Sequence, residues 1–130
     1  MREPKLVLVI LAVRDVARMR AFYSTLLDWK AVVDVPVYVE LESSLGLRLG
    51  LYQEESFGRN TGLPASPPSP STTRTELYLH CEDLDAAMER AGRAGARPLA
   101  GRAQKPWGDE AAYFADPEGN VVVLAAPLGG

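Results

Sequence analysis

Three side chains that could bind a ligand or move a proton alternate along the short segment ELYLH at residues 76–80. Successive side chains of a β-strand point to opposite faces, so Glu76, Tyr78 and His80 are expected to share one face. A carboxylate and an imidazole there could serve as acid–base groups, which makes Glu76 and His80 the catalytic candidates. Two ordinary explanations compete with this one: Glu76 could pair with Arg48 or Arg74, and His80 could be a hydrogen-bonded strand histidine.

Aromatic side chains near other polar groups extend the candidate ligand-binding set. Trp107 lies between Pro106 and Gly108 in a segment without strand or helix period. A tryptophan braced in this way offers a flat stacking surface, although it could equally plug the end of a barrel. Tyr38 and Glu40 alternate with apolar residues and are expected to join the polar face, unless the tyrosines are ordinary sheet aromatics.

The elements that would position these side chains repeat along the chain. An apolar segment at 6–13 predicts a strand, and Asp15 is placed to cap an amphipathic helix that follows it. Further strands are expected near 30–35, 37–42 and 47–53. A shift of 68 residues places Asp15 on Asp83, where the pattern restarts with a strand, a helix ending at Gly95, and strands near 96–99, 111–115 and 121–125. Each half is therefore expected to be a βαβββ module.

Strand alternation assigns the faces of the two first strands. Leu77, Leu79 and Cys81 are expected to face the second helix, opposite the polar set. The equivalent open face in the first half carries Leu8, Ile10 and Ala12, all of them apolar. If the two sheets curve around a common cleft, one wall would exclude water and the other would orient a ligand.

The last two strands are expected to form a hairpin closed by the turn at 116–120. Asp116 can accept bonds from backbone N–H groups ahead of it, and Pro117 presets the φ angle of a type I turn. Gly119 tolerates a positive φ. This hairpin follows directly after the segment that carries Trp107.

The length of the chain and the positions of its predicted helices, strands and loops favour an α+β fold in one domain. Its 130 residues suit a single core. Module one is expected at 1–57 and module two at 74–127, joined by a connector at 58–73 that is rich in proline and serine. Such a composition argues against a helix or strand in the connector.

Composition excludes several classes of partner. The net charge is −3 and the sequence pI is about 5.2. No run of lysine and arginine could follow a phosphate backbone, so nucleic acid is not expected as a partner. No apolar segment has the ~18 to 20 residues of a membrane span. The single cysteine cannot form an intrachain disulfide, and a cytoplasmic location is expected.

Three segments in this order resemble the vicinal oxygen chelate superfamily, which contains glyoxalase I, bleomycin-resistance proteins and extradiol dioxygenases. They are VRDVARMRAFYSTLLDW, ELYLHCEDLDAAMERAGRAGA and WGDEAAYFADPEGNVVVL. The resemblance covers nearly the whole chain. It implies that the paired modules form an incomplete barrel around a central cleft, and that the protein is a homodimer.

The resemblance also places the metal ligands of the metal-dependent members. They match Leu8, Gly50, Glu76 and Val123, and of these only Glu76 can bind a metal. Sites for transition metals normally need three or more protein ligands. The family's metal is therefore expected to be absent, and no cofactor is expected.

Without a metal the chain is most similar to the bleomycin-resistance type, which binds a small molecule without transforming it. A planar cationic metabolite or antibiotic fits the carboxylates and aromatic rings of the candidate set. Two alternatives remain open: a metal-independent lyase, isomerase or dioxygenase-type enzyme that uses Glu76 or His80, and a degenerate interaction module. The ligand-binding candidates are Glu76, Tyr78, His80, Trp107, Tyr38 and Glu40.

Overall fold

The computed structural model describes residues 3–63 and 73–129. The chain divides into two compact units, residues 1–67 and residues 68–130. The prediction of an irregular connector falls for the most part on residues 64–72, outside the described residues. Each unit is described by itself below.

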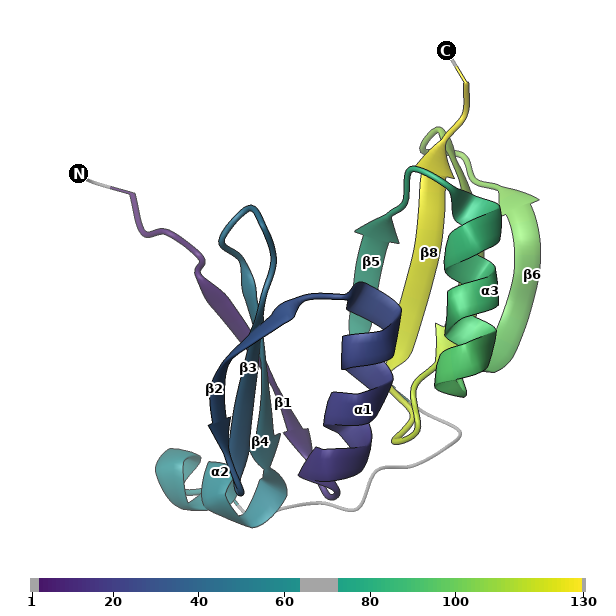
Figure 1. The fold of residues 1–130 in the computed structure, drawn as a ribbon. Coiled ribbons are helices and arrows are strands. Elements are labelled where there is room, and N and C mark those ends of the chain that lie inside the picture. Colours follow the sequence, from purple (N-terminus) through teal and green to yellow (C-terminus); the bar gives the residue numbers. More distant parts are fainter. Residues whose placement is uncertain (1–2, 64–72, 130) are drawn as a thin grey trace. The chain divides into compact units, whose positions relative to one another are not determined.

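The first unit is the predicted βαβββ module with one additional helix (Figure 1). Its sheet has the strand order β1-β4-β3-β2, with β1 parallel to β4 and the other neighbours antiparallel. Helix α1 packs against β3 and β4. Its elements are β1 (Leu8–Val13), α1 (Val16–Leu27), β2 (Lys30–Val35), β3 (Tyr38–Glu42), β4 (Arg48–Gln53) and α2 (Glu54–Thr61).

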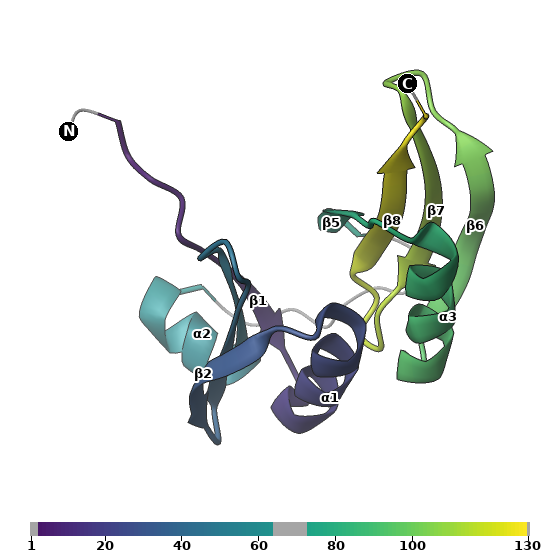
Figure 2. The same cartoon turned by 45° about the horizontal axis from the view of Figure 1, so that its top comes forward.

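The second unit repeats this topology. Its strand order, β5-β8-β7-β6, is the order of the first unit with each strand replaced by its counterpart in the repeat, and β5 is again parallel to β8. Helix α3 packs against β8, and Figure 2 shows it along one face of this sheet. The fold is thus α+β, with two βαβββ modules that each form a four-stranded mixed sheet. The elements are β5 (Glu76–His80), α3 (Leu84–Ala94), β6 (Arg97–Gln104), β7 (Asp109–Ala115) and β8 (Val121–Pro127).

Equivalent aspartates start the two long helices, as the repeat predicts. Asp15 accepts a hydrogen bond from the backbone N–H of Arg18 at 2.9 Å, and Asp83 accepts one from that of Ala86 at 3.0 Å. Each carboxylate satisfies one of the N–H groups that a helix start leaves unpaired. Helix α3 ends at Gly95, whose φ of 93° belongs to the left-handed region that favours glycine.

The apolar core of each unit lies between its helix and its sheet. In the first unit Met19 and Tyr23 of α1 are fully buried together with Leu41 and Leu51 of the sheet. In β5 the alternation agrees with the prediction, because Leu77 and Leu79 are half-buried while Glu76, Tyr78 and His80 are exposed. The polar side chains of β5 therefore lie on the face of the second sheet opposite α3.

The predicted hairpin near the C-terminus is confirmed. Strands β7 and β8 are antiparallel. In the turn, Asp116 Oδ1 accepts from the N–H groups of Glu118 at 2.9 Å and Asn120 at 3.0 Å. Gly119 has a φ of 92°. In the described residues no helix is long and apolar enough to cross a membrane.

Two predicted element boundaries are wrong. The expectation that 58–73 contains no helix fails at its start, because α2 runs to Thr61. The Gln53 side chain caps this helix by accepting from the N–H groups of Glu55 and Ser56, at 3.0 and 3.1 Å. The strand expected near 96–99 is longer, since β6 continues to Gln104 as the outer partner of β7.

Candidate functional site

Strand register gathers polar side chains on the face of the second sheet that lies opposite α3. Tyr78 on β5 pairs with Val123 on β8, and His80 pairs with Ala125. On the other side of β8, Ala125 pairs with Ala111 of β7. Asp109 lies two residues before Ala111 and therefore points to the same face as Tyr78 and His80.

Asp109 links two of the three polar side chains of β5. Its Oδ2 accepts a hydrogen bond from the Tyr78 hydroxyl at 2.5 Å and lies 3.1 Å from His80 Nε2. The Asp109 side chain is only 11% exposed, whereas that of His80 is 57% exposed. Between them, Ala111 and Ala125 are fully buried and small, which leaves the phenol and the imidazole room to reach across to the carboxylate.

The contacts at Asp109 set its charge. Hydrogen bonds from Tyr78 and then His80 lower the pKa of the Asp109 carboxyl, against the opposing effect of desolvation. The pKa of the Tyr78 hydroxyl is raised, first by desolvation and then by its bond to Asp109. An ionised carboxylate only accepts hydrogen bonds, so His80 Nε2 must carry the proton in this contact. The Nδ1 lone pair of a neutral His80 is then left for another partner.

Trp107 joins the same group of side chains through its ring nitrogen. Its Nε1–H donates to the Tyr78 hydroxyl at 2.8 Å, while the residue remains 59% exposed. The turn that carries it is closed by two backbone bonds, from Lys105 N–H to the Asp109 carbonyl at 2.7 Å and from Gly108 N–H to the Lys105 carbonyl at 3.0 Å. The indole is therefore held at one edge while part of its surface meets solvent.

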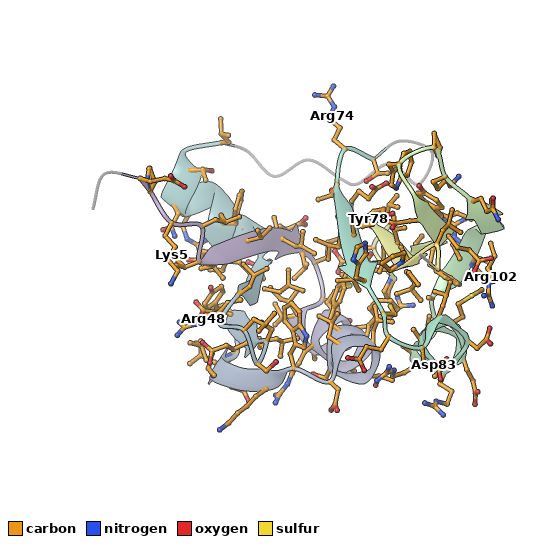
Figure 3. The ribbon with its side chains drawn as sticks, turned by 90° about the horizontal axis from the view of Figure 1, so that it is seen from above. Lys5, Arg48, Arg74, Tyr78, Asp83 and Arg102 are labelled. Carbon is orange, nitrogen blue, oxygen red and sulfur yellow. The ribbon has the colours of Figure 1, made fainter. Side chains whose placement is uncertain are left out.

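Glu76 shares the face but makes no direct contact with this group. It lies at the opposite end of β5 and is exposed. Among the described residues of the second unit it forms no ion pair with Arg74, which projects away from the ribbon in Figure 3. Figure 3 also shows Tyr78 on β5. The pairing with Arg74 considered from the sequence is therefore not formed in this unit, and the pairing with Arg48 of the other unit stays a prediction.

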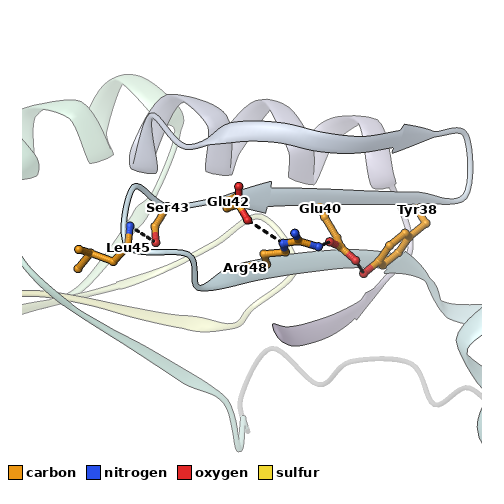
Figure 4. Close-up of polar contacts among 6 residues, drawn as sticks. All are labelled: Tyr38, Glu40, Glu42, Ser43, Leu45 and Arg48. Atoms are coloured by element: carbon orange, nitrogen blue, oxygen red, sulfur yellow. Dashed lines mark hydrogen bonds and ion pairs between the residues drawn. The ribbon is translucent and has the colours of Figure 1, made fainter. Parts of the chain in front are cut away.

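A second polar cluster lies in the first unit, on the sheet face opposite α1. The Tyr38 hydroxyl donates to Glu40 Oε2 at 2.5 Å (Figure 4). Arg48 donates to Glu40 Oε1 from Nη1 at 3.1 Å and to Glu42 Oε2 from Nε at 2.9 Å. The pKa of Tyr38 is raised by desolvation and by its hydrogen bond to Glu40. Tyr38 and Glu40 thus lie together, as the sequence predicts.

A glycine makes this second cluster possible. Gly50 is the register partner of both Ile10 and Glu40. A Cβ atom at Gly50 would lie 2.7 Å from the Tyr38 hydroxyl oxygen and 2.9 Å from Cγ1 of Ile10. Both distances are shorter than side-chain atoms tolerate, so the Tyr38 hydroxyl occupies space that any side chain at position 50 would need.

Comparisons with known proteins agree with this architecture. Residues 6–129 match the model of the glyoxalase-like domain. The chain belongs to the glyoxalase-like domain family. The family lies within the glyoxalase/bleomycin resistance/dioxygenase superfamily, as the resemblance in the sequence implies. No curated protein matches the chain.

Solved structures with the glyoxalase-like fold cover almost all of the chain. A glyoxalase-related enzyme from Fulvimarina pelagi is 20% identical over 97% of this chain and 93% of that one, with a TM-score of 0.81. A glyoxalase/bleomycin resistance protein/dioxygenase from Nocardioides is 25% identical over 100% and 87%, with a TM-score of 0.80. A family enzyme from Burkholderia phytofirmans PsJN is 20% identical over 96% and 100%, with a TM-score of 0.81. These likenesses support the fold.

The positions that match the metal ligands of glyoxalase-like proteins do not fit a metal in this chain. Leu8 and Val123 have no donor atom, and Val123 is fully buried. Gly50 has no side chain, and the Tyr38 hydroxyl fills the space beside it. Among the described residues of either unit, no three histidine, cysteine, aspartate or glutamate side chains are grouped to hold a metal ion. Glu76 alone is too few ligands.

The sequence analysis missed Asp109 and the partners that Arg48 has within the first unit. Alternation in β7 could have placed Asp109 on the face of Tyr113, but only the register of β5, β8 and β7 shows that this is also the face of Tyr78. The partners of Arg48 likewise depend on the pairing of β3 with β4, where Glu42 lies opposite Arg48. The partners of a side chain across neighbouring strands cannot be deduced from the sequence of its own strand alone.

Proposed function

We propose that this protein binds a planar, cationic small organic molecule, without a metal ion, on the polar face of β5 and β7. The observation that carries the proposal is the exposed Trp107 indole, fixed by its bond to Tyr78, whose own hydroxyl is bonded to the ionised Asp109. A fixed indole stacks on a flat ligand at little entropic cost, because the ring is already ordered before binding.

Charge on this face favours a cation. Asp109 carries a carboxylate whose pKa is lowered, and Glu76 adds a second, exposed carboxylate. A cation over the face of an indole gains about 0.5 to 2 kcal/mol from the ring quadrupole, most when the pair is desolvated. Lys105 lies over the ring of Tyr113, and Arg102 pairs with Asp85 of α3 and with Glu110, whose side chain points to the other face of the sheet.

Metal independence rests on the donor set. Of the four positions that match family ligands only Glu76 has a donor atom, and the space at Gly50 is taken by Tyr38. Elemental analysis of protein purified without chelator tests this part. Less than one tenth of an ion of zinc, nickel, manganese or iron per chain is expected, and about one ion per chain that disappears in Glu76→Gln contradicts it.

The binding experiment uses a matched pair of flat ligands: N-methylquinolinium, which is cationic, and methylnaphthalene, its uncharged analogue of similar shape. The fluorescence of Trp107 is followed in a Trp29→Phe background, so that one indole reports. We expect quenching by the cation at concentrations where the neutral analogue has little effect. Losing a charge-assisted contact costs roughly 1.5 to 3 kcal/mol, so Glu76→Gln should weaken binding about tenfold or more.

Controls separate this site from nonspecific stacking. Glu89→Gln removes an exposed carboxylate from α3, which packs on the other face of the sheet, and should bind the cation as the parent does. Trp107→Ala, measured by calorimetry, should lose affinity by an amount comparable to that of Glu76→Gln. Equal affinity of Glu76→Gln, Trp107→Ala and the parent would disprove the proposed site.

A further inference from the structure

We propose that His80, oriented by Asp109, is a general base that removes the proton next to the charged C=N group of a bound iminium cation and returns it. The step interconverts the iminium ion and its neutral enamine, and the returned proton can come from solvent. The inference rests on the proposed function for the class of ligand, and adds an activity to it. It is drawn from the position of one imidazole between a buried carboxylate and solvent.

The geometry of His80 suits a proton acceptor. Nε2 lies 3.1 Å from the Asp109 carboxylate, and that side chain is 11% exposed. This contact fixes the ring and assigns the proton to Nε2. The His80 side chain is 57% exposed, and within the described residues no hydrogen bond is formed by its Nδ1. The Nδ1 lone pair of this exposed ring is therefore left to accept a proton from a ligand.

Neighbouring groups on the same face are less suited to this role. The Tyr78 hydroxyl donates its proton to Asp109 and accepts from Trp107, so its hydrogen-bonding capacity is largely used. Asp109 is buried and holds two donors on one oxygen. Glu76 is exposed at the opposite end of β5 from His80, and within the described residues no carboxylate orients it as Asp109 orients His80.

The charge of the site selects the kind of carbon acid. Removing a proton from a neutral carbonyl compound makes an enolate, which needs a positive group or strong donors nearby. The cation of Lys105 lies over the Tyr113 ring, whereas the charged group nearest His80 is the carboxylate of Asp109, at 3.1 Å. An iminium ion avoids this requirement, because loss of a proton gives a neutral enamine, and the carboxylates favour its cationic starting state.

The reaction balances without a cofactor. His80 Nδ1 takes the proton from the carbon next to C=N, the C–H electron pair becomes a C=C bond, and the C=N π pair moves to nitrogen. The imidazolium that forms is stabilised by Asp109 at 3.1 Å. Return of a proton from Nδ1 to the same carbon restores the iminium ion. If the proton on Nδ1 exchanges with deuterium from heavy water before it returns, the carbon acquires a deuterium label. Nothing is oxidised or reduced.

A stable probe tests the activity without knowledge of the natural substrate. An N-methyl-dihydroisoquinolinium ion that carries a methyl group on its iminium carbon exchanges those methyl protons through an enamine. In heavy water the loss of the methyl signal is followed by proton NMR. At saturating probe, the protein should exchange the methyl protons about 100-fold faster than free imidazole at equal concentration.

Single substitutions distinguish the roles of His80 and Asp109 in the exchange reaction. His80→Gln should lose the acceleration while still binding the probe, as measured by Trp107 fluorescence, and Glu89→Gln should keep both. Asp109→Asn should slow exchange by about tenfold or more, because an amide no longer fixes the tautomer. His80 is the chain's one histidine, so its nitrogen NMR signals are unambiguous. They should report an Nε2–H ring in the parent and a mixture of tautomers in Asp109→Asn.

The outcomes distinguish this inference from the proposed function. A probe that binds but exchanges no faster than with free imidazole overturns the inference and leaves the binding proposal intact. Equal exchange in His80→Gln and the parent, or an Nδ1–H tautomer in the parent, overturns it as well. A probe that does not quench Trp107 contradicts the binding of planar cations, and the inference with it.

Discussion

Asp109 is the residue on which the polar face of the second unit depends. One of its oxygens accepts from both Tyr78 and His80, and Tyr78 in turn accepts from Trp107. Removing the carboxylate would therefore alter the protonation of His80 and the position of the indole together. Side chains that share a network of this kind act together, so their single-variant effects are not expected to add.

The lowered pKa of Asp109 predicts how stability depends on pH. The carboxyl has a lower pKa in the folded chain than its ordinary value of 3.8. Its ionised form therefore stabilises the fold above pH 3.8, and this contribution is lost as the pH falls through the lower, folded-state pKa. Urea unfolding of the parent and of Asp109→Asn should show a stability difference that is present at pH 5 and shrinks as the pH falls below 3.8.

Taking the difference between the two proteins removes the contributions of most other titratable groups to the pH dependence of stability. Carboxylates distant from Asp109 titrate in both proteins and drop out of the difference. A difference that keeps its full size below pH 3.8 would mean that Asp109 is not held ionised by Tyr78 and His80.

At the level of residues, the sequence predicts types and faces better than partners. Alternation in ELYLH correctly places Tyr78 and His80 on one exposed face, because the period of a strand is a local property. The carboxylate that binds both of them lies 29 residues beyond His80 in the sequence. Its partnership depends on the register of three strands, and no local pattern encodes that register.

Among the elements, β4 shows how one strand position shapes a whole face. Gly50 lies between Ile10 of β1 and Glu40 of β3. Because it has no Cβ, the Tyr38 ring lies over the strand and its hydroxyl reaches Glu40. Glu40 is only 8% exposed, so the bonds from Tyr38 and Arg48 satisfy a carboxylate that would otherwise be costly to bury.

Gly50→Ala should destabilise the first unit by about 1 to 3 kcal/mol, because the added methyl group meets the Tyr38 hydroxyl at 2.7 Å and Ile10 at 2.9 Å. Gly101→Ala in β6 is the matched control, since nothing lies within 4 Å of a Cβ there, and it should be neutral or stabilising. Urea unfolding measures both. In a Tyr38→Phe background the cost of Gly50→Ala should fall, and equal destabilisation by the two alanines would contradict the crowding at Gly50.

Element boundaries are predicted well where local chemistry marks them. Asp15, Asp83 and Gly95 delimit helices as expected, because capping depends on residues within one turn. Helix α2 escapes prediction since Gly58, Asn60 and Thr61 are poor helix formers, and its start is fixed by Gln53 at the end of a strand. The length of β6 comes from pairing with β7 across two irregularities, which is a long-range effect.

At the scale of the whole molecule, the internal repeat leaves four strand edges. Each sheet has two outer strands with one neighbour apiece: β1 and β2 in the first unit, β5 and β6 in the second. Strand β6 is exposed along all eight of its residues. Unpaired edges present backbone N–H and C=O groups that can pair with another chain, and soluble proteins cover or protect them.

We propose that the chain is a homodimer, in which a second copy covers part of these edges and of the exposed apolar side chains beside them, such as Val32 and Leu99. Closed two-fold pairing uses the same surface on both copies and prevents continued growth. Light scattering across a dilution series should give about twice the chain mass of 14.1 kDa, and the unfolding temperature should fall on dilution because association stabilises the fold. Glu89→Gln, on the exposed surface of α3, should dimerise as the parent does. A mass of 14.1 kDa at every concentration, with an unfolding temperature independent of dilution, would show that the edges are protected within one chain.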